Sequence, residues 1–125
     1  MTSMSCMRTI HAPHGRRSPM VRAMIVEYIR YTIAADRADH FVSAYTDAGA
    51  SLRASEHCLG YELTRCTEAA DSFILRILWD SERGHLEGFR TSAQFKPFFA
   101  AIQPYVKDIT EMRHYAATSV VWTRS

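Results

Sequence analysis

The run MIVEYIRYTI, residues 24–33, carries bulky side chains at almost every position and constrains the fold more than any other stretch. Its β-branched and aromatic residues favour a strand. Alternation divides them into two faces, Ile25, Glu27, Ile29 and Tyr31 on one and Val26, Tyr28, Arg30 and Thr32 on the other. Because both faces hold large side chains, we expect the strand to be covered twice, by helices on one side and by a second sheet on the other.

A helix and a hairpin are predicted next. Asp36 stands where a helix N-cap is expected, and apolar residues follow at helical spacing as far as Leu52. Residues 58–65 alternate as a strand with one apolar face does, and residues 73–79 form an almost continuously apolar strand. The apolar face of the first strand would consist of Leu59, Tyr61 and Leu63. The polar residues 68–71 predict the turn between the two strands.

Two further helices and a last strand complete the chain. Asp80 or Ser81 would cap a short helix that packs Leu86 and Phe89 on one side. The longer helix should begin near Lys96, because the proline at 97 is tolerated only in a first turn, and the proline at 104 would kink it. Residues 109–115 predict the last strand, and residues 116–125 either prolong it or form a tail.

The resulting order, β-α-β-β-α-α-β, is that of a ferredoxin-like split βαβ unit with one extra helical turn. The expected class is α+β, with a four-stranded antiparallel sheet and helices on one face. The other face would be bare and would display Tyr28, Arg30 and apolar hairpin residues. Since an exposed apolar sheet needs a partner, we expect two sheets to pack face to face in a homodimer.

Composition indicates one folded domain, residues 24–115, preceded by a basic segment. The chain has 125 residues, which suffices for a single core. Residues 1–23 contain four arginines and no acid, and predict a flexible basic tail; a transit peptide is the weaker alternative, since no amphipathic period is sustained. The rest holds all 13 acidic side chains and is slightly acidic, which argues against a nucleic-acid partner.

Hydropathy and cysteine usage suit a cytoplasmic protein with no membrane partner. No apolar run approaches the roughly 20 residues of a membrane helix. Cys58 and Cys66 would lie roughly 26 Å apart along one strand, too far for a disulfide, and Cys6 makes the number odd. Because no Cys/His group has the spacing of a zinc site, we expect reduced thiols and no metal.

Glu27 is the charged residue on an otherwise apolar strand face. A buried carboxylate must be paired or neutralised. Its candidate partners are Tyr45, Arg30, Arg76 and His114. If Glu27 faced an open pocket instead, its pKa would rise and it would become a candidate base.

His85 lies at the edge of the apolar side of the short helix. The position is compatible with packing and equally with catalysis, because an imidazole with a pKa of about 6.5 can accept a proton near neutral pH. Arg90 follows five residues later, which on an α-helix is about 140° away, so the two side chains would not point together unless the short helix unwinds at Gly88. Arg90 is therefore expected to be a structural anchor that pairs with Glu87 or with an acid on the first helix.

Five stretches occur together in one known family: IVEYIRYTI, the helix with Phe41 and Tyr45, CLGYEL, Trp79-Asp80-Ser81-Glu82, and FRTSAQFKPFF. In this order they resemble the antibiotic biosynthesis monooxygenase family of dimeric α+β barrels, over about residues 24–115. The resemblance implies the split βαβ domain and a dimer through the sheet face. It implies no single reaction, because the chemistry of the family is mixed.

Haem degradation is disfavoured among those reactions. Where haem-degrading relatives have an Asn, a Trp and a His, this chain has Ile29, Phe89 and Phe99. None of these side chains can ligate iron. The resemblance to cofactor-independent oxygenases of polyketide quinones is closer, since their strand-end Trp matches Trp79 and their Tyr falls on His85.

Two other polar residues of those oxygenases, an Asn and an Arg, fall here on Leu75 and Phe99. The leading hypothesis is a homodimeric monooxygenase without a cofactor, in which His85 assists deprotonation of a small phenol or hydroquinone and the anion reacts with O2. Besides His85 and Trp79, the expected pocket residues are Glu27, Ile29, Tyr45, Leu75, Phe89, Phe99 and His114. The alternatives are a non-catalytic dimeric ligand-binding or stress-response module and an isomerase that uses His85 with Glu27.

Overall fold

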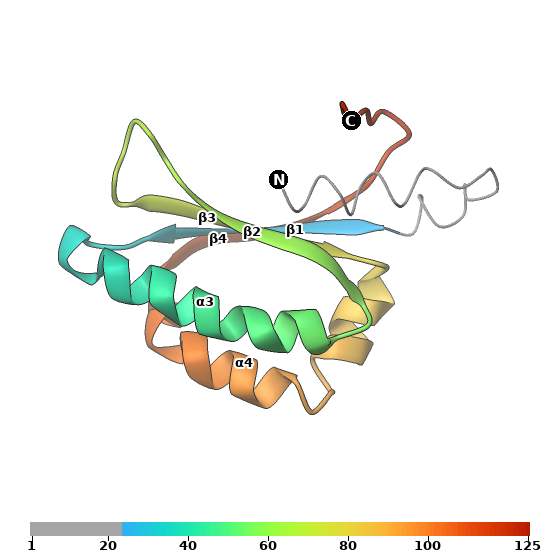
Figure 1. Ribbon diagram of the computed structural model, residues 1–125, viewed down its shortest axis with the longest axis horizontal. Coiled ribbons are helices and arrows are strands. Elements are labelled where there is room, and N and C mark those ends of the chain that lie inside the picture. The colour runs from blue at the N-terminus through green and yellow to red at the C-terminus, as the bar shows by residue number, and fades with distance from the viewer. Residues whose placement is uncertain (1–23) are drawn as a thin grey trace.

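The computed structural model describes residues 24–125. One antiparallel sheet has the order β2-β3-β1-β4, with strands β1 (Ile25–Thr32), β2 (Cys58–Arg65), β3 (Ser72–Trp79) and β4 (Ile109–Ala116). The helical segments are η2 (Ala35–Arg37), α3 (Ala38–Ala54), η3 (Gly84–Phe89), α4 (Phe95–Ile102) and η4 (Gln103–Asp108). Helices α3 and α4 cover one face of the sheet (Figure 1). The predicted α+β class and the order of the elements are confirmed.

The core lies between the sheet and these helices, and Phe41 of α3 is at its centre. The Phe41 ring is fully buried and packs edge-on against aromatic rings of β1, β3 and η4. Burying one such side chain contributes about 1.5–3 kcal/mol relative to leaving it in water. The aromatic layer thus fixes α3 across the middle of the sheet.

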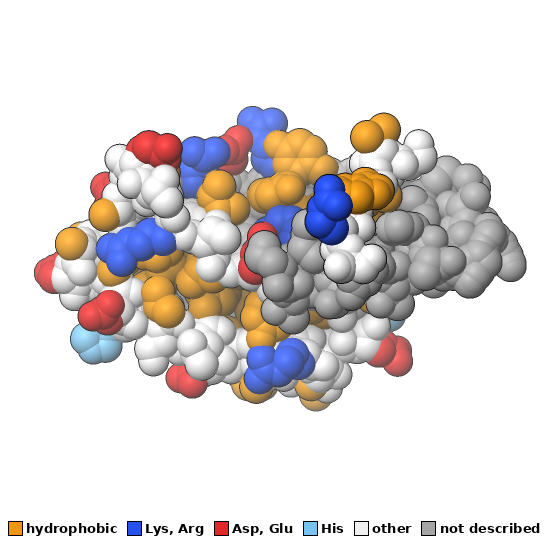
Figure 2. Space-filling view, turned by 45° about the horizontal axis from the view of Figure 1, so that its top comes forward, with side chains coloured by type: hydrophobic (Ala, Val, Ile, Leu, Met, Phe, Trp, Pro, Cys, Tyr) orange, Lys and Arg blue, Asp and Glu red, His pale blue; other side chains and the backbone are white. Residues whose placement is uncertain are grey.

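Strand β1 alternates as predicted. Glu27, Ile29 and Tyr31 are buried on the helix side, whereas Tyr28 and Arg30 point to the other face. That open face is mixed rather than apolar, since charged side chains interrupt its apolar ones (Figure 2). Its contacts include the Arg30–Glu111 ion pair at 3.6 Å. The prediction of a bare apolar face on the sheet is therefore only partly correct.

Strand β2 departs from simple alternation at its start. Its register with β3 shifts between Cys58 and Gly60. A bulge of this kind turns the next side chains to the opposite face. Leu59 accordingly packs with Met24 and Leu78 on the open side, while Tyr61 and Leu63 pack against the main core. The prediction that all three apolar residues share one face is wrong for Leu59.

Helix boundaries match the prediction better at α4 than at α3. Asp36 lies inside η2 and caps nothing, because α3 begins after it without a side-chain cap. Pro97 lies in the first turn of α4, as expected. Pro104 lies in the first turn of η4, so the helix changes to 3-10 geometry there instead of kinking.

Beyond β4 the chain has no regular structure, although the Ala117 N–H donates a 3.0 Å bond to the Met24 carbonyl. Residues 117–125 therefore form a tail and not a longer strand. The predicted basic tail and Cys6 lie outside the described residues, among which Cys58 and Cys66 are thiols, as expected. None of the described helices combines the length and apolarity that a membrane crossing requires. Cytoplasmic location stays a prediction.

Candidate functional site

A cavity of about 170 Å³ lies between the sheet and the C-terminal helices. Its wall is mainly aromatic and aliphatic, and includes Ile29, Tyr45, Trp79, Phe89, Phe98 and Phe99. Three polar residues, Glu27, His85 and Arg90, reach the same cavity. Since an apolar cavity of about 150 Å³ holds a benzene molecule, this one has room for a single substituted ring.

Most of the predicted pocket residues line this cavity, but Leu75 and His114 do not. Leu75 is fully buried and lines a separate hollow under α3, together with Tyr61 and the outer side of Tyr45. It precedes Trp79 by four residues on β3, which is about 13 Å along a strand. Leu75 therefore does not line the cavity that Trp79 lines, contrary to the prediction.

Glu27 is the centre of a polar cluster at the cavity wall. The indole N–H of Trp79 donates a 2.9 Å hydrogen bond to Glu27 Oε1. His85 Nε2 lies 3.5 Å from the same oxygen, and His114 Nε2 lies 3.6 Å from Glu27 Oε2. The two imidazoles also meet, with His85 Nδ1 and His114 Nε2 3.2 Å apart. We call Glu27, His85 and His114 the Glu-His-His cluster.

The sheet explains why these side chains meet. Glu27 and His114 are cross-strand partners on β1 and β4, so both side chains point to the helix side. Trp79 lies two residues beyond Ile77, the partner of Glu27 on β3, and its long indole reaches back diagonally. The Trp79 ring in turn stacks on His85, with centroids 4.6 Å apart and planes 15° apart.

Of the predicted partners of Glu27, only His114 contacts it. The hydroxyl of Tyr45 bonds to another tyrosine, and Arg30 and Arg76 lie on the opposite face of the sheet. Sequence reasoning missed the Trp79 donor. A signal was present, because Trp79 ends the strand next to β1 on the same face as Glu27, and a buried indole N–H needs an acceptor.

Burial shifts the pKa values of Glu27 and His85, the two buried members of the Glu-His-His cluster. Burial raises the pKa of Glu27, against the lowering effects of the Trp79 hydrogen bond and of the charges of His114 and Arg90. Burial, with those same two cationic neighbours, lowers the pKa of His85 from 6.5 to about 4. His85 is therefore neutral at pH 7, and its 3.5 Å approach to Glu27 is a polar contact of a neutral ring instead of an ion pair.

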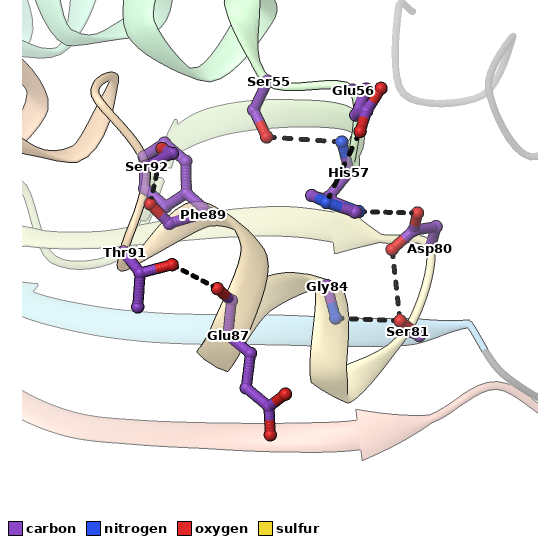
Figure 3. A network of polar contacts seen from close by, with 10 residues as sticks. All are labelled: Ser55, Glu56, His57, Asp80, Ser81, Gly84, Glu87, Phe89, Thr91 and Ser92. Atoms are coloured by element: carbon purple, nitrogen blue, oxygen red, sulfur yellow. Dashed lines mark hydrogen bonds and ion pairs between the residues drawn. The ribbon is translucent and has the colours of Figure 1, made fainter.

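The segment that carries His85 is a π-helix. Ser81 caps its start, as predicted, by accepting a 2.9 Å bond from the Gly84 N–H (Figure 3). The Arg90 N–H donates to the carbonyl of His85, five residues back, at 3.2 Å. This wider turn brings both side chains to one cavity. The 140° separation expected for an α-helix therefore does not apply, because the segment around Gly88 departs from α-helical winding.

Two smaller expectations for this segment are also wrong. Glu87 pairs with Arg83 one turn earlier, at 3.4 Å, and not with Arg90. Leu86 is 40% exposed and does not pack, while Phe89 is buried. Both differences follow from the π-helix, because the wider turn rotates successive side chains away from the positions they would take on an α-helix.

A second histidine, His57, holds the π-helix against the end of β3. Its Nδ1 lies 3.0 Å from Asp80 Oδ2 (Figure 3). The ring sits beside Gly84 and Gly88. A Cβ atom at either glycine would clash with the His57 ring. These glycines therefore permit the close approach that positions His85.

Within residues 24–125 the Glu-His-His cluster also has the composition of a metal site. One donor atom from each of its three residues lies within 4.8 Å of the other two. Two imidazole nitrogens and a carboxylate oxygen suit a divalent transition metal. The prediction of no metal rested on spacing along the chain, which cannot detect ligands from β1, η3 and β4.

Comparison with known proteins agrees with this architecture. The curated protein YczJ of Bacillus subtilis, described as uncharacterized, is 21% identical over 75 residues, which are 60% of this chain and 79% of that protein. A conserved protein of Methanosarcina mazei superposes with a TM-score of 0.67 at 17% identity, covering 79% of this chain and 97% of the other.

SnoaB of Streptomyces nogalater, a cofactor-independent oxygenase, superposes with a TM-score of 0.61 at 14% identity. The match covers 82% of this chain and 99% of SnoaB. At such identities the structural matches show the fold alone. The sequence profile of the antibiotic biosynthesis monooxygenase family matches residues 24–101, most of the described domain. The chain belongs to the antibiotic biosynthesis monooxygenase family.

Proposed function

We propose that this protein is a monooxygenase that acts with O2 on a small phenol or hydroquinone and uses no cofactor. The observation that carries the proposal is the position of the Glu27 carboxylate, beside His85, at the wall of an otherwise apolar cavity. Membership of the family and the fold shared with the oxygenase SnoaB support this class of reaction.

The cavity favours one aromatic ring. Its volume of about 170 Å³ is only slightly larger than that of a cavity known to hold benzene. A fused three-ring substrate would therefore fit only if the walls moved. The Phe89 and Trp79 rings supply flat apolar surfaces 5.2 Å apart at their centroids. The ring of the substrate would lie against such surfaces with its hydroxyl toward Glu27.

The cluster would take the proton of that hydroxyl. A carboxylate that is only 3% exposed is a stronger base than one in water, and the neutral His85 ring makes a polar contact with it that would orient it toward the substrate. The phenolate then reacts directly with O2. For a hydroquinone, one oxygen atom enters the ring and the other leaves as water, so the products are a hydroxyquinone and water, and the substrate supplies all the electrons.

The test is oxygen uptake by the purified protein with a panel of one-ring hydroquinones and phenols. We expect uptake above the buffer rate, lost in Glu27→Gln and reduced in His85→Ala. His40→Ala, on the outer side of α3, is the matched control and should behave as the wild type. Binding without uptake would support the rival ligand-binding module, and a rate unaffected by both site variants would refute the proposed site.

We also propose that two copies pack through the open face of the sheet, as the resemblance implies. Tyr28 and Tyr115 lie on that face 38% and 51% exposed and form an edge-to-face pair at 5.4 Å. The charged pair of Arg30 with Glu111 beside them can make reciprocal contacts across a two-fold axis.

A further inference from the structure

We propose that the Glu-His-His cluster is a binding site for one divalent transition-metal ion of the Zn²⁺ or Co²⁺ type. The inference goes beyond the proposed oxygenase and does not depend on it. It rests on the distances, the burial and the chemistry of Glu27, His85 and His114.

The distances match those around a metal ion. The donor atoms approach one another at 3.2, 3.5 and 3.6 Å. Ligand atoms of a tetrahedral ion with bonds of about 2.1 Å lie about 3.4 Å apart. His85 makes its two approaches with different nitrogens and Glu27 makes its two with different oxygens, whereas a tetrahedral ion would take one donor atom from each residue. Since a single donor from each residue already lies within 4.8 Å of the others, side-chain rotations suffice to complete the set.

The donor types select the class of ion. Two imidazole nitrogens with one carboxylate suit Zn²⁺, Co²⁺ and related first-row ions, whereas Mg²⁺ and Ca²⁺ prefer sets of oxygen ligands. The side chains of Glu27 and His85 are 4% and 8% exposed, and that of His114 is 31% exposed. An ion could therefore enter past His114 and then be largely shielded from water.

The surroundings of the cluster hold its ligands in place. The Trp79 indole donates to Oε1 of Glu27 and stacks on the His85 ring, as partners around bound metals orient their ligands. His85 itself stands on a π-helix, a feature frequent at functional sites. Three protein ligands beside a cavity leave a fourth position open, which is typical of catalytic zinc and not of structural zinc.

Arg90 opposes metal binding. Its positive charge acts on both Glu27 and His85 from the rim of the same cavity. A bound dication would be repelled by it unless the exposed guanidinium turned toward solvent. We therefore expect Arg90→Gln, which removes this positive charge, to tighten metal binding.

The experiment titrates the untagged full-length protein with Co²⁺, followed by visible absorption, and with Zn²⁺, followed by calorimetry. We expect one intense tetrahedral Co²⁺ spectrum per chain, displaced by Zn²⁺. Glu27→Gln, His85→Ala and His114→Gln should each weaken binding by about tenfold or more. Arg90→Gln should strengthen it. His40→Ala, which removes an exposed histidine on the outer side of α3, is the matched control and should bind as the wild type.

Circular dichroism and thermal melting of each variant show whether it is folded, and His114→Gln, at a partly exposed position, is the variant least liable to unfold. Absence of the Co²⁺ spectrum, or equal affinity in all three cluster variants and the wild type, would overturn the proposal, and so would loss of binding in His40→Ala alone. No oxygen or aromatic substrate enters these titrations, so their failure is distinguishable from failure of the proposed oxygenase.

Discussion

The indole N–H of Trp79 donates a 2.9 Å hydrogen bond to Glu27 Oε1, which links the end of β3 to the middle of β1 inside the cavity. The bond holds the carboxylate in one orientation and offsets part of the rise that burial causes in its pKa. A hydrogen bond to a charged group is worth about 1.5–3 kcal/mol. The position of the carboxylate therefore depends on this one donor.

Trp79→Phe should lower the rate of oxygen uptake by about tenfold or more while the protein stays folded. Phenylalanine keeps an aromatic ring against His85 but removes the donor, so Glu27 loses its fixed orientation. Kinetics with the best one-ring substrate, together with thermal melting, measure the effect. The control is Trp122→Phe, at a residue 68% exposed in the tail, and an equal loss in both variants would contradict the role of Trp79.

Gly88→Ala should destabilise the fold by about 1–3 kcal/mol, the cost of forcing an extra methyl group against packed atoms. The methyl group would meet the His57 ring, which must then move away from Asp80. Chemical denaturation of Gly88→Ala, His57→Ala and the double variant forms a double-mutant cycle. We expect Gly88→Ala to cost little in the His57→Ala background, and purely additive costs would disprove the close contact.

The sequence predicts this site only in part. Alternation along β1 correctly puts Glu27 on the helix side, because the period of a strand is two wherever no bulge intervenes. It fails for Leu59, where a bulge reverses the faces. Arg90 was misplaced because helical spacing assumes an α-helix, and the five-residue hydrogen bond from Arg90 to His85 has no signature in composition.

Tyr31 and Tyr45 should resist ionisation in the folded protein. Burial raises the pKa of Tyr31 to about 12, although the hydrogen bond to Tyr45 acts to lower it. Burial also raises the pKa of Tyr45. Because the fold favours the neutral phenols, the unfolded chain releases their protons first as pH passes about 10. Stability should therefore fall from about pH 10 upward, by about 1.4 kcal/mol per pH unit for each tyrosine.

Tyrosinate absorbance during an alkaline titration measures this effect. Of the six tyrosines, these two should ionise only when circular dichroism reports unfolding. Tyr31→Phe should reduce the part of the absorbance that appears with unfolding. Ionisation of all six tyrosines near pH 10 in a folded protein would show that the two hydroxyls are not buried.

Tyr115→Glu should shift the protein from dimer to monomer. It would place two like charges near a two-fold axis, if the open sheet face is the interface. Light scattering at micromolar concentration should give twice the 14.3 kDa chain mass for the wild type and a single chain mass for the variant. Leu86→Glu, which adds the same charge to the 40% exposed residue of η3, should stay dimeric. A monomeric wild type would refute the interface.

One equivalent of Zn²⁺ should suppress oxygen uptake, and a chelator should restore it. Both proposals use Glu27 and His85, and the atoms that would take the proton from the substrate are the atoms that would bind the ion. Binding to Zn²⁺ occupies the imidazole nitrogen and withdraws charge from the carboxylate, so both groups become weaker bases and the two uses compete.

Arg90→Gln should make the suppression occur at lower free Zn²⁺, since it removes the charge that repels the ion, whereas His40→Ala should be suppressed as the wild type is. Oxygen uptake against free Zn²⁺ in a metal buffer gives the midpoint for each variant. If Zn²⁺ occupied the cluster by the Co²⁺ displacement test while uptake continued at the full rate, the proton would have to leave through a group other than Glu27 or His85.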